Sequence, residues 1–202
     1  MKTSEGKIKY IGLSAVSSAT LRRAVKIAPV AAVQVDYSPF VRDPEGPTGT
    51  ELLATCRELG VAVVAAMPLG RGLLTSTFAT GDYKPDEGDM RGSRMPRFQE
   101  GNREKNAQVV AGFKKLSDKK GITVAQLALA WVLKQGNDII PIPGTKKLKY
   151  LEENWATLGI ELSDEEEKEV RRFAESAEED LAGAALPEAF KHYNYRDTVE
   201  EK

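Results

Sequence analysis

The sequence predicts an α/β fold: a parallel sheet of four strands with flanking helices. Two observations support this prediction. Short runs rich in Val, Ile and Ala alternate along the 202 residues with amphipathic helical segments, which is the pattern of βαβ units. The run at 61–67 is apolar throughout, as expected of a strand with both faces covered. We count four such runs, whereas a closed (β/α)₈ barrel has eight in about 250 residues.

The first expected strand covers 7–14, where aromatic and β-branched residues suit a pleated sheet. Ser17 or Ser18 can then cap a helix, because a serine hydroxyl accepts from a free amide of the first turn. Pro29 ends this helix. The second expected strand, at 30–37, follows directly.

A helix over 50–59 is expected to end at Gly60, because glycine adopts the left-handed conformation of a helix C-terminus most easily. The third strand is 61–67. Residues 71–101 hold five Gly and two Pro without a sustained period, so we expect a long loop, a kind of segment that is usually functional or disordered.

The remaining elements are expected in the second half of the chain. Two of its helices open with capping boxes, a Ser or Thr followed three residues later by Gln or Glu. These elements are helices at 102–120, 123–134, 148–156 and 163–177 and a fourth strand at 139–142. We therefore expect one domain over 1–177 and a tail over 178–202 that is either a wrapping arm or disordered.

Composition narrows the function classes. Lys and Arg number 29 against 30 Asp and Glu, and the net charge of −1 predicts no attraction to nucleic acid or an anionic membrane. No apolar run approaches the roughly 20 residues that span a bilayer, and MKTSEGKIKY lacks the apolar core of a signal peptide. With Cys56 and His192 as the single cysteine and histidine, an internal disulfide and a Cys/His metal cluster are excluded. We expect a cytoplasmic protein.

Four motifs in order carry a resemblance to a known family. They are GKIKYIGLS at 6–14, VQVDYSPF with the Arg at 42, MPLGRGLL at 67–74 and IPGTKKLKYLEEN at 142–154, and MPRFQEGN at 95–102 adds to them. With these motifs the chain resembles the aldo-keto reductases, NADP(H)-dependent oxidoreductases with (β/α)₈ barrels.

The resemblance covers the fifth to eighth strands of that barrel. It implies a TIM-barrel-derived half barrel that keeps the cofactor side. The family's catalytic Asp, Tyr, Lys and His lie on the first four strands and have no counterpart here, and His192 lies in the tail. A shortened natural protein and a fragment are both compatible with this pattern.

The resemblance also implies cofactor-binding residues. Ser14 and Gln34 match positions that hold the nicotinamide carboxamide, and Tyr37 matches the aromatic that stacks on its ring. Ala15 stands where many members have Asn, which removes one hydrogen bond. The other implied residues are Pro68, Leu69, Gly70, Arg71 and Gly72 at the pyrophosphate, Lys146 and Lys147 at the 2′-phosphate, and Glu153 and Asn154 at the adenine.

Three functions remain open at this point. The first is an NADP(H)-dependent oxidoreductase acting on a small molecule, with Asp36, Tyr37 or Arg42 as candidate catalytic residues. The second is a lyase, isomerase or cyclase that uses the same cleft for acid/base chemistry. The third is a non-catalytic remnant that binds a partner or a nucleotide.

The strand count also implies a partner. Four barrel strands leave two unpaired edges and an uncovered inner face, which we expect to be apolar. We expect a homodimer to cover them, or else another chain, the 71–101 loop or the 178–202 tail.

Overall fold

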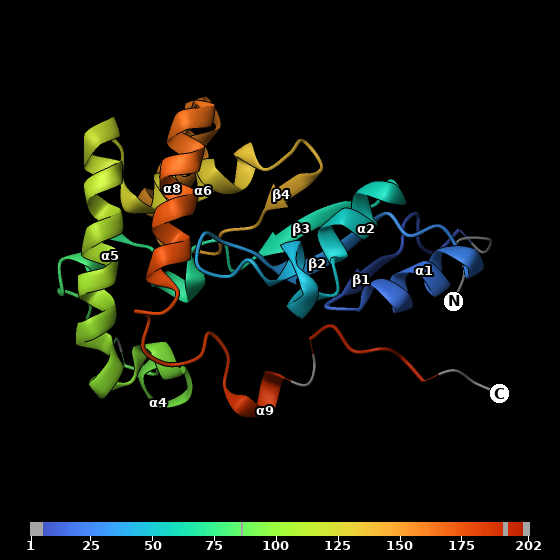
Figure 1. The fold of residues 1–202 in the computed structure, drawn as a ribbon, viewed down its shortest axis with the longest axis horizontal. Coiled ribbons are helices and arrows are strands. Elements are labelled where there is room, and N and C mark those ends of the chain that lie inside the picture. The colour runs from blue at the N-terminus through green and yellow to red at the C-terminus, as the bar shows by residue number, and fades with distance from the viewer. Residues whose placement is uncertain (1–5, 86, 192–193, 200–202) are drawn as a thin grey trace.

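The computed structural model describes residues 6–85, 87–191 and 194–199 (Figure 1). Its sheet has four strands in the order β1-β2-β3-β4, and each neighbouring pair is parallel. This confirms the predicted four-stranded parallel sheet. The strands are β1 (Gly12–Ser14), β2 (Ala32–Asp36), β3 (Ala62–Ala66) and β4 (Ile139–Pro141).

Only one face of the sheet is fully covered. Val33 and Val35 of β2 and Val63 of β3 are buried, and they point towards the helices. The alternate residues form the opposite face, which we call the inner face and which holds Ser14, Gln34, Asp36, Val64, Ala66 and Ile140. The expectation of a wholly apolar inner face is wrong, because its β1 and β2 half is polar.

The helices begin and end where their capping residues predict. Ser17 accepts from the Thr20 amide at the start of α1, and both expected capping boxes are formed. Gly60 follows α2 with a φ of +67°. The longer helices are α1 (Ser18–Ile27), α2 (Leu52–Glu58), α5 (Glu100–Lys120), α6 (Val124–Lys134), α7 (Leu148–Ala156) and α8 (Asp164–Ala177).

Residues 71–101 are more ordered than expected. They contain α3 (Ser76–Ala79), α4 (Arg91–Arg94) and a 3₁₀ turn at Pro96–Phe98. The rings of Phe78, Tyr83 and Phe98 pack against one another in tilted and edge-to-face pairs, with ring centroids 5.5 to 5.7 Å apart. These contacts fold the segment onto itself, because aromatic pairs hold together residues that have no helical or strand period.

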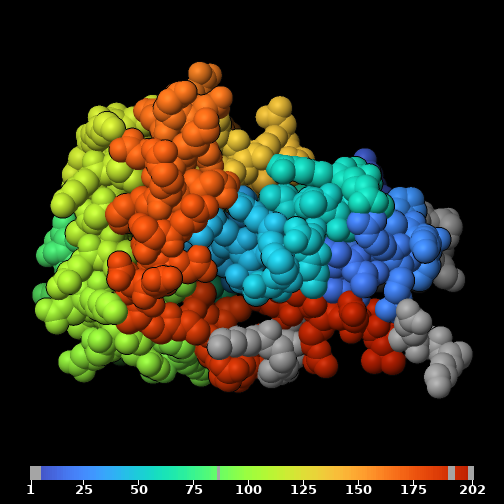
Figure 2. Space-filling view, in the orientation of Figure 1, coloured from blue at the N-terminus to red at the C-terminus, as the bar shows by residue number. Residues whose placement is uncertain are grey.

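The described part of the tail, 178–191 and 194–199, includes the short helix α9 (Glu188–Lys191) and crosses from the end of α8 to the start of α1 (Figure 1). In the space-filling view it lies along one margin of the molecule, against the N-terminal third of the chain (Figure 2). Within the described residues, no helix has both the length and the apolar character to cross a membrane.

Candidate functional site

A cavity of about 550 Å³ opens at the carboxyl ends of β1, β2 and β3. Because these strands are parallel, their last residues and the loops that follow meet at one edge of the sheet. Side chains from both the sheet and the tail line the cavity. They include Ser14, Gln34, Asp36 and Arg71 from the sheet side, and Leu186, Phe190 and Asn194 from the tail.

Ser14 and Gln34 form the polar floor of this cavity. They are direct register partners on β1 and β2, so their side chains leave the inner face side by side. Both residues are exposed, and neither side chain makes a hydrogen bond to another described residue. The Ala15 amide, which follows Ser14, donates to the Gln34 carbonyl at 2.8 Å and fixes their relative position.

An ion pair stands beside this floor. Arg71 Nη2 donates to Asp36 Oδ2 at 2.9 Å, and the two side chains are only 18% and 19% exposed. Arg71 has a φ of +61°, and Arg91 Nη1 donates to its carbonyl at 2.7 Å. Gly72, the next residue, has a φ of +98°, in the left-handed region that favours glycine, so the loop after β3 needs glycine at this position.

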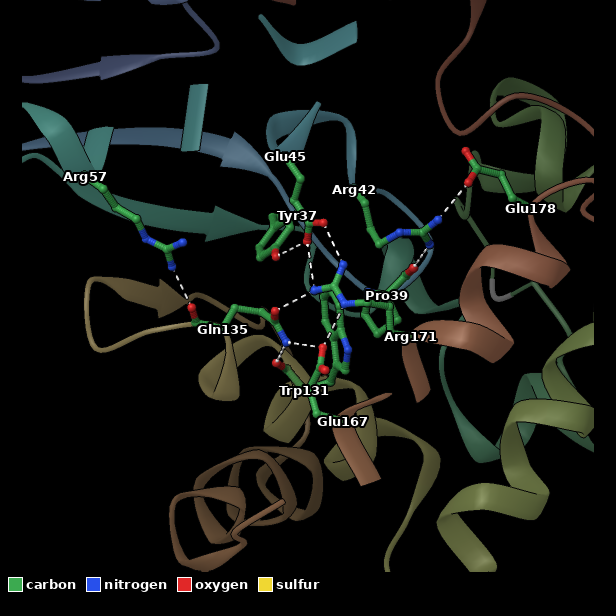
Figure 3. Close-up of polar contacts among 10 residues, drawn as sticks. All are labelled: Tyr37, Pro39, Arg42, Glu45, Arg57, Trp131, Gln135, Glu167, Arg171 and Glu178. Atoms are coloured by element: carbon green, nitrogen blue, oxygen red, sulfur yellow. Dashed lines mark hydrogen bonds and ion pairs between the residues drawn. The ribbon is translucent and has the colours of Figure 1, made fainter. Parts of the chain in front are cut away.

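Arg42 does not line the cavity. Its guanidinium donates to the Pro39 carbonyl at 2.6 Å and to Glu178 Oε2 at 2.8 Å (Figure 3). Burial, followed by the nearby Glu178 charge, raises the pKa of the neighbouring Asp43. Arg42 therefore ties the start of the tail to the loop after β2.

Tyr37 lies away from the cavity. Its ring is 1% exposed and packs 5.6 Å from the Trp131 ring, and its hydroxyl donates to Glu45 at 2.5 Å (Figure 3). Burial raises the pKa of Tyr37, and the Glu45 charge adds to the effect. The structure thus places Tyr37 among α6 and α8, where its ring presents no face to a ligand in the cavity. This arrangement corrects the role implied for it by the resemblance.

Arg171 on α8 completes this buried cluster. It donates to Glu45 at 2.7 Å, to Gln135 at 2.7 Å and to Glu167 at 2.9 Å (Figure 3). Its guanidinium also lies 5.1 Å from the centroid of the Trp131 ring, within cation–π range. The cluster joins α6, α8 and the loop after β2 behind the sheet.

The remaining expected cofactor residues lie outside the lining of this cavity. Lys146 and Lys147 are exposed in the loop that leads from β4 into α7. Glu153 accepts from Thr123 Oγ1 at 2.6 Å and so joins α7 to α6, and Asn154 follows it on α7. In the loop after β3, Pro68 is buried, Leu69 is half-buried and Gly70 opens a 3₁₀ turn.

The tail residues of the cavity were missed from the sequence. Their side of the cavity is held by bonds to distant residues: the Asn106 side chain donates to the Ala182 carbonyl and accepts from its amide, and the Tyr195 amide donates to the Ala15 carbonyl. Burial raises the pKa of Tyr195, as do the nearby charges of Asp43 and Asp36. The available signal was the two large apolar residues Leu186 and Phe190 in a segment of mostly small and charged residues.

Comparison with known proteins identifies the family. The model of the aldo/keto reductase family matches residues 2–175. The chain belongs to the aldo/keto reductase family. Among curated members, it is 46% identical over 193 residues to aldo-keto reductase yakc [NADP(+)] of Schizosaccharomyces pombe, covering 96% of this chain and 55% of that protein. It is 50% identical over 175 residues to aldo-keto reductase str7 of Strobilurus tenacellus, and this match covers 86% of this chain and 51% of that protein.

Solved structures of aldo/keto reductases agree with the fold. A glycerol dehydrogenase from Gluconobacter oxydans superposes with a TM-score of 0.72 at 31% identity, covering 85% of this chain and 50% of that one. A Klebsiella pneumoniae aldo-keto reductase in complex with NADPH superposes with a TM-score of 0.62 at 25% identity. This superposition also covers 85% of this chain and 50% of that one. The chain thus spans about half the length of the relatives it matches, and its strands have the arrangement of half a TIM barrel.

Proposed function

We propose that this chain is the NADP(H)-binding half of a carbonyl or alcohol oxidoreductase, with a small molecule as substrate. The observation that carries the proposal is the Ser14–Gln34 pair, a hydroxyl and an amide side by side with free hydrogen-bonding groups at the cavity. A nicotinamide carboxamide has one acceptor oxygen and a donor NH₂, which such a pair can satisfy. The cofactor named for the S. pombe relative and the NADPH complex of the K. pneumoniae enzyme support the proposal.

Other features fit the rest of this cofactor. The cavity volume of about 550 Å³ lies within the usual range of small-molecule sites. Arg71, on the loop after β3, supplies a cation for the pyrophosphate, and glycine at 70 and 72 permits close approach of the backbone. Lys146 and Lys147 stand just before α7, where a helix N-terminus and two ammonium groups favour a 2′-phosphate.

When bound, NADP(H) supplies or accepts the hydride. Ser14 and Gln34 then orient the carboxamide, and Leu186 and Phe190 keep water from that side of the cavity. Asp36 uses one carboxylate oxygen to hold Arg71, so its Oδ1 is the atom we assign to accepting the proton that an alcohol releases when it is oxidised. Tyr37 and Arg42 are engaged elsewhere and take no part in this step.

The Asp36–Arg71 pair also supports a second candidate function. A carboxylate held inside a cavity can transfer protons without a nicotinamide, as a lyase, isomerase or cyclase requires. For this candidate, mass spectrometry of the purified protein would show a bound small molecule other than NADP(H). Asp36→Asn would abolish its turnover.

The test of the primary proposal is a titration with NADPH followed by tryptophan fluorescence. Gln34→Ala removes one hydrogen-bonding group and is expected to weaken NADPH about 3- to 10-fold. Gln108→Ala, an exposed glutamine on α5, is the matched control and should leave binding unchanged. No saturable NADPH binding by the wild-type chain would overturn the proposal.

A further inference from the structure

The loop after β3 is held by an arginine that lies 20 residues further along the chain. Arg91, the first residue of α4, donates from Nη1 to the carbonyl oxygen of Arg71 at 2.7 Å. This bond joins a side chain to the main chain, so it restrains the backbone of Arg71. Arg71 has a φ of +61° and a ψ of +24°, in the left-handed region that residues other than glycine adopt only where their surroundings hold them there.

The backbone conformation of Arg71 decides where its side chain points. The guanidinium lines the cavity, and its Nη2 donates to Asp36 Oδ2 at 2.9 Å. With φ in the right-handed region, the Cα–Cβ bond would leave the main chain in another direction and carry the guanidinium away from Asp36. Within the described residues, Asp36 is the hydrogen-bonding partner of this guanidinium. Since a guanidinium has several N–H donors, the others are available to a ligand.

Arg91 is held rigidly by its own neighbours. Asp89 accepts from Arg91 Nε at 3.0 Å and from Arg91 Nη2 at 2.6 Å, and this bidentate pairing fixes the plane of the guanidinium. The Tyr83 hydroxyl donates to the same carboxylate at 2.8 Å. The centroids of the Tyr83 and Phe98 rings lie 4.9 and 5.4 Å from Arg91 Cζ, within cation–π range. With its plane fixed, Arg91 keeps Nη1 directed at the Arg71 carbonyl.

We propose that Arg91 is a positioning residue for Arg71. It holds the Arg71 backbone in the left-handed conformation and thereby directs the Arg71 guanidinium into the cavity, where that group binds the pyrophosphate of NADPH. The binding step rests on the proposed function, whereas the hold of Arg91 on Arg71 is a property of the protein without ligand. The proposal also gives a role to the 71–101 segment, which carries Arg91 and the residues that hold it.

Geometry, and not charge, carries this role. The charges of Arg91 and Asp89 offset each other across a 2.6 Å ion pair, so Arg91 adds little net attraction for a phosphate. Lysine would keep the positive charge. Its single ammonium group cannot bind both Asp89 oxygens and the Arg71 carbonyl in the planar arrangement of a guanidinium. Arg91→Lys therefore separates positioning from simple electrostatic attraction.

The first experiment is ¹⁵N NMR of the arginine Nε–H groups in the protein without ligand, with Arg71→Ala to identify the Arg71 signal by its loss. We expect rotation of the Arg71 guanidinium about its Nε–Cζ bond to be faster in Arg91→Lys than in the wild-type protein by about 5-fold or more, because a displaced guanidinium loses its bond to Asp36. Arg94→Lys, at an exposed site on the same helix, is the matched control and should leave the signal unchanged. An Arg71 signal that is the same in Arg91→Lys and in the wild-type protein would overturn the positioning role.

The second experiment is a calorimetric titration with NADPH of the wild-type protein, Arg91→Lys, Arg71→Ala and the double variant. We expect Arg91→Lys to weaken NADPH about 5- to 20-fold and Arg71→Ala to weaken it at least as much. The double variant should bind NADPH as Arg71→Ala does, because Arg91 then has no guanidinium left to position. Adenosine 2′-phosphate, which lacks the pyrophosphate, should bind equally well to all four proteins.

The outcomes of the titration are distinct. Losses that multiply in the double variant would overturn the proposal, because Arg91 would then act on NADPH without Arg71. Equal weakening of NADPH and adenosine 2′-phosphate by Arg91→Lys would also overturn it, because the substitution would then disturb the whole site. If the wild-type protein does not bind NADPH while the Arg71 signal responds to Arg91→Lys, the proposed function fails and the hold of Arg91 on Arg71 stands.

Discussion

Ser14 and Gln34 are register partners on adjacent parallel strands, and both side chains leave the inner face at the cavity. Their neighbours in the sequence have other roles. Val33 and Val35, on either side of Gln34, pack under the helices, and Ala15, which follows Ser14, turns the chain with a φ of +50°. The two polar side chains therefore lie on the inner face of the sheet, and the opposite face packs against the core. This relationship is the basis of the cofactor proposal.

The chain alone should show little standard carbonyl reductase activity. No residue matches the family's four catalytic positions, and a general acid commonly contributes 10²- to 10⁴-fold to such a rate. The measurement is NADPH oxidation with 4-nitrobenzaldehyde, followed by absorbance. A rate normal for aldo/keto reductases would show that the chain supplies its own proton donor.

Replacing Arg171 with Ala should destabilise the fold by about 2 kcal/mol. The change leaves Glu45 and Glu167 without their cation and removes the guanidinium from the Trp131 ring. Urea unfolding followed by Trp131 fluorescence measures the effect. Arg172→Ala, an exposed neighbour on α8, is the control, and an equal loss in both variants would contradict the assignment.

The stability of the 71–101 segment should depend on pH through Asp89. Hydrogen bonds from Arg91 hold the pKa of Asp89 well below its usual value near 3.9. A carboxyl with a lowered folded-state pKa stabilises the fold above its unfolded pKa, and this contribution disappears as the pH falls through the folded value. Asp89→Asn should therefore lower the free energy of unfolding by about 2 kcal/mol at pH 7. Below about pH 4 the variant should lose less stability than the wild-type protein does.

Urea midpoints at pH 7, 4 and 3 test this prediction. Asp180→Asn is the matched control, because Asp180 is exposed and its carboxylate makes no ion pair with another described residue. An acid dependence that is the same in Asp89→Asn and in the wild-type protein would count against the role of Asp89.

Asn106→Ala should release the tail. Asn106 is fully buried, and its amide group donates to the Ala182 carbonyl at 2.9 Å and accepts from the Ala182 amide at 2.7 Å. Loss of these bonds should cost about 2 to 3 kcal/mol and speed hydrogen exchange at the Ala182 amide about 10-fold or more. Asn137→Ala, at an exposed site, should change neither, and unchanged exchange in Asn106→Ala would exclude this anchor.

The strands and helix ends could be predicted because their signals are local. Ser17, Thr123 and Ser163 cap helices through side chains three residues from the amides they bind, and Gly60 ends α2 by its own backbone conformation. The first strand was predicted to begin at Lys7 but begins at Gly12. Its pairing with β2 starts at Gly12, because Gly12 is the register partner of Ala32, the first residue of β2.

The site was predicted in part. Strand alternation places Gln34 and Asp36 on one face and Val33, Val35 and Tyr37 on the other, so the buried position of Tyr37 was available from the sequence. The position of the tail could not be predicted, because its anchors join residues 76 to 180 positions apart through a few polar bonds. No local pattern encodes such contacts.

The most direct test of the central claim compares NADPH with 2′,5′-ADP, which lacks the nicotinamide, by calorimetry on two variants. Gln34→Ala should weaken NADPH about 3- to 10-fold and leave 2′,5′-ADP unchanged, because the lost group contacts only the carboxamide. Lys146→Ala should weaken both ligands, because both carry the 2′-phosphate. Equal weakening of both ligands by Gln34→Ala, or no effect on either, would contradict the proposed nicotinamide site on Ser14 and Gln34.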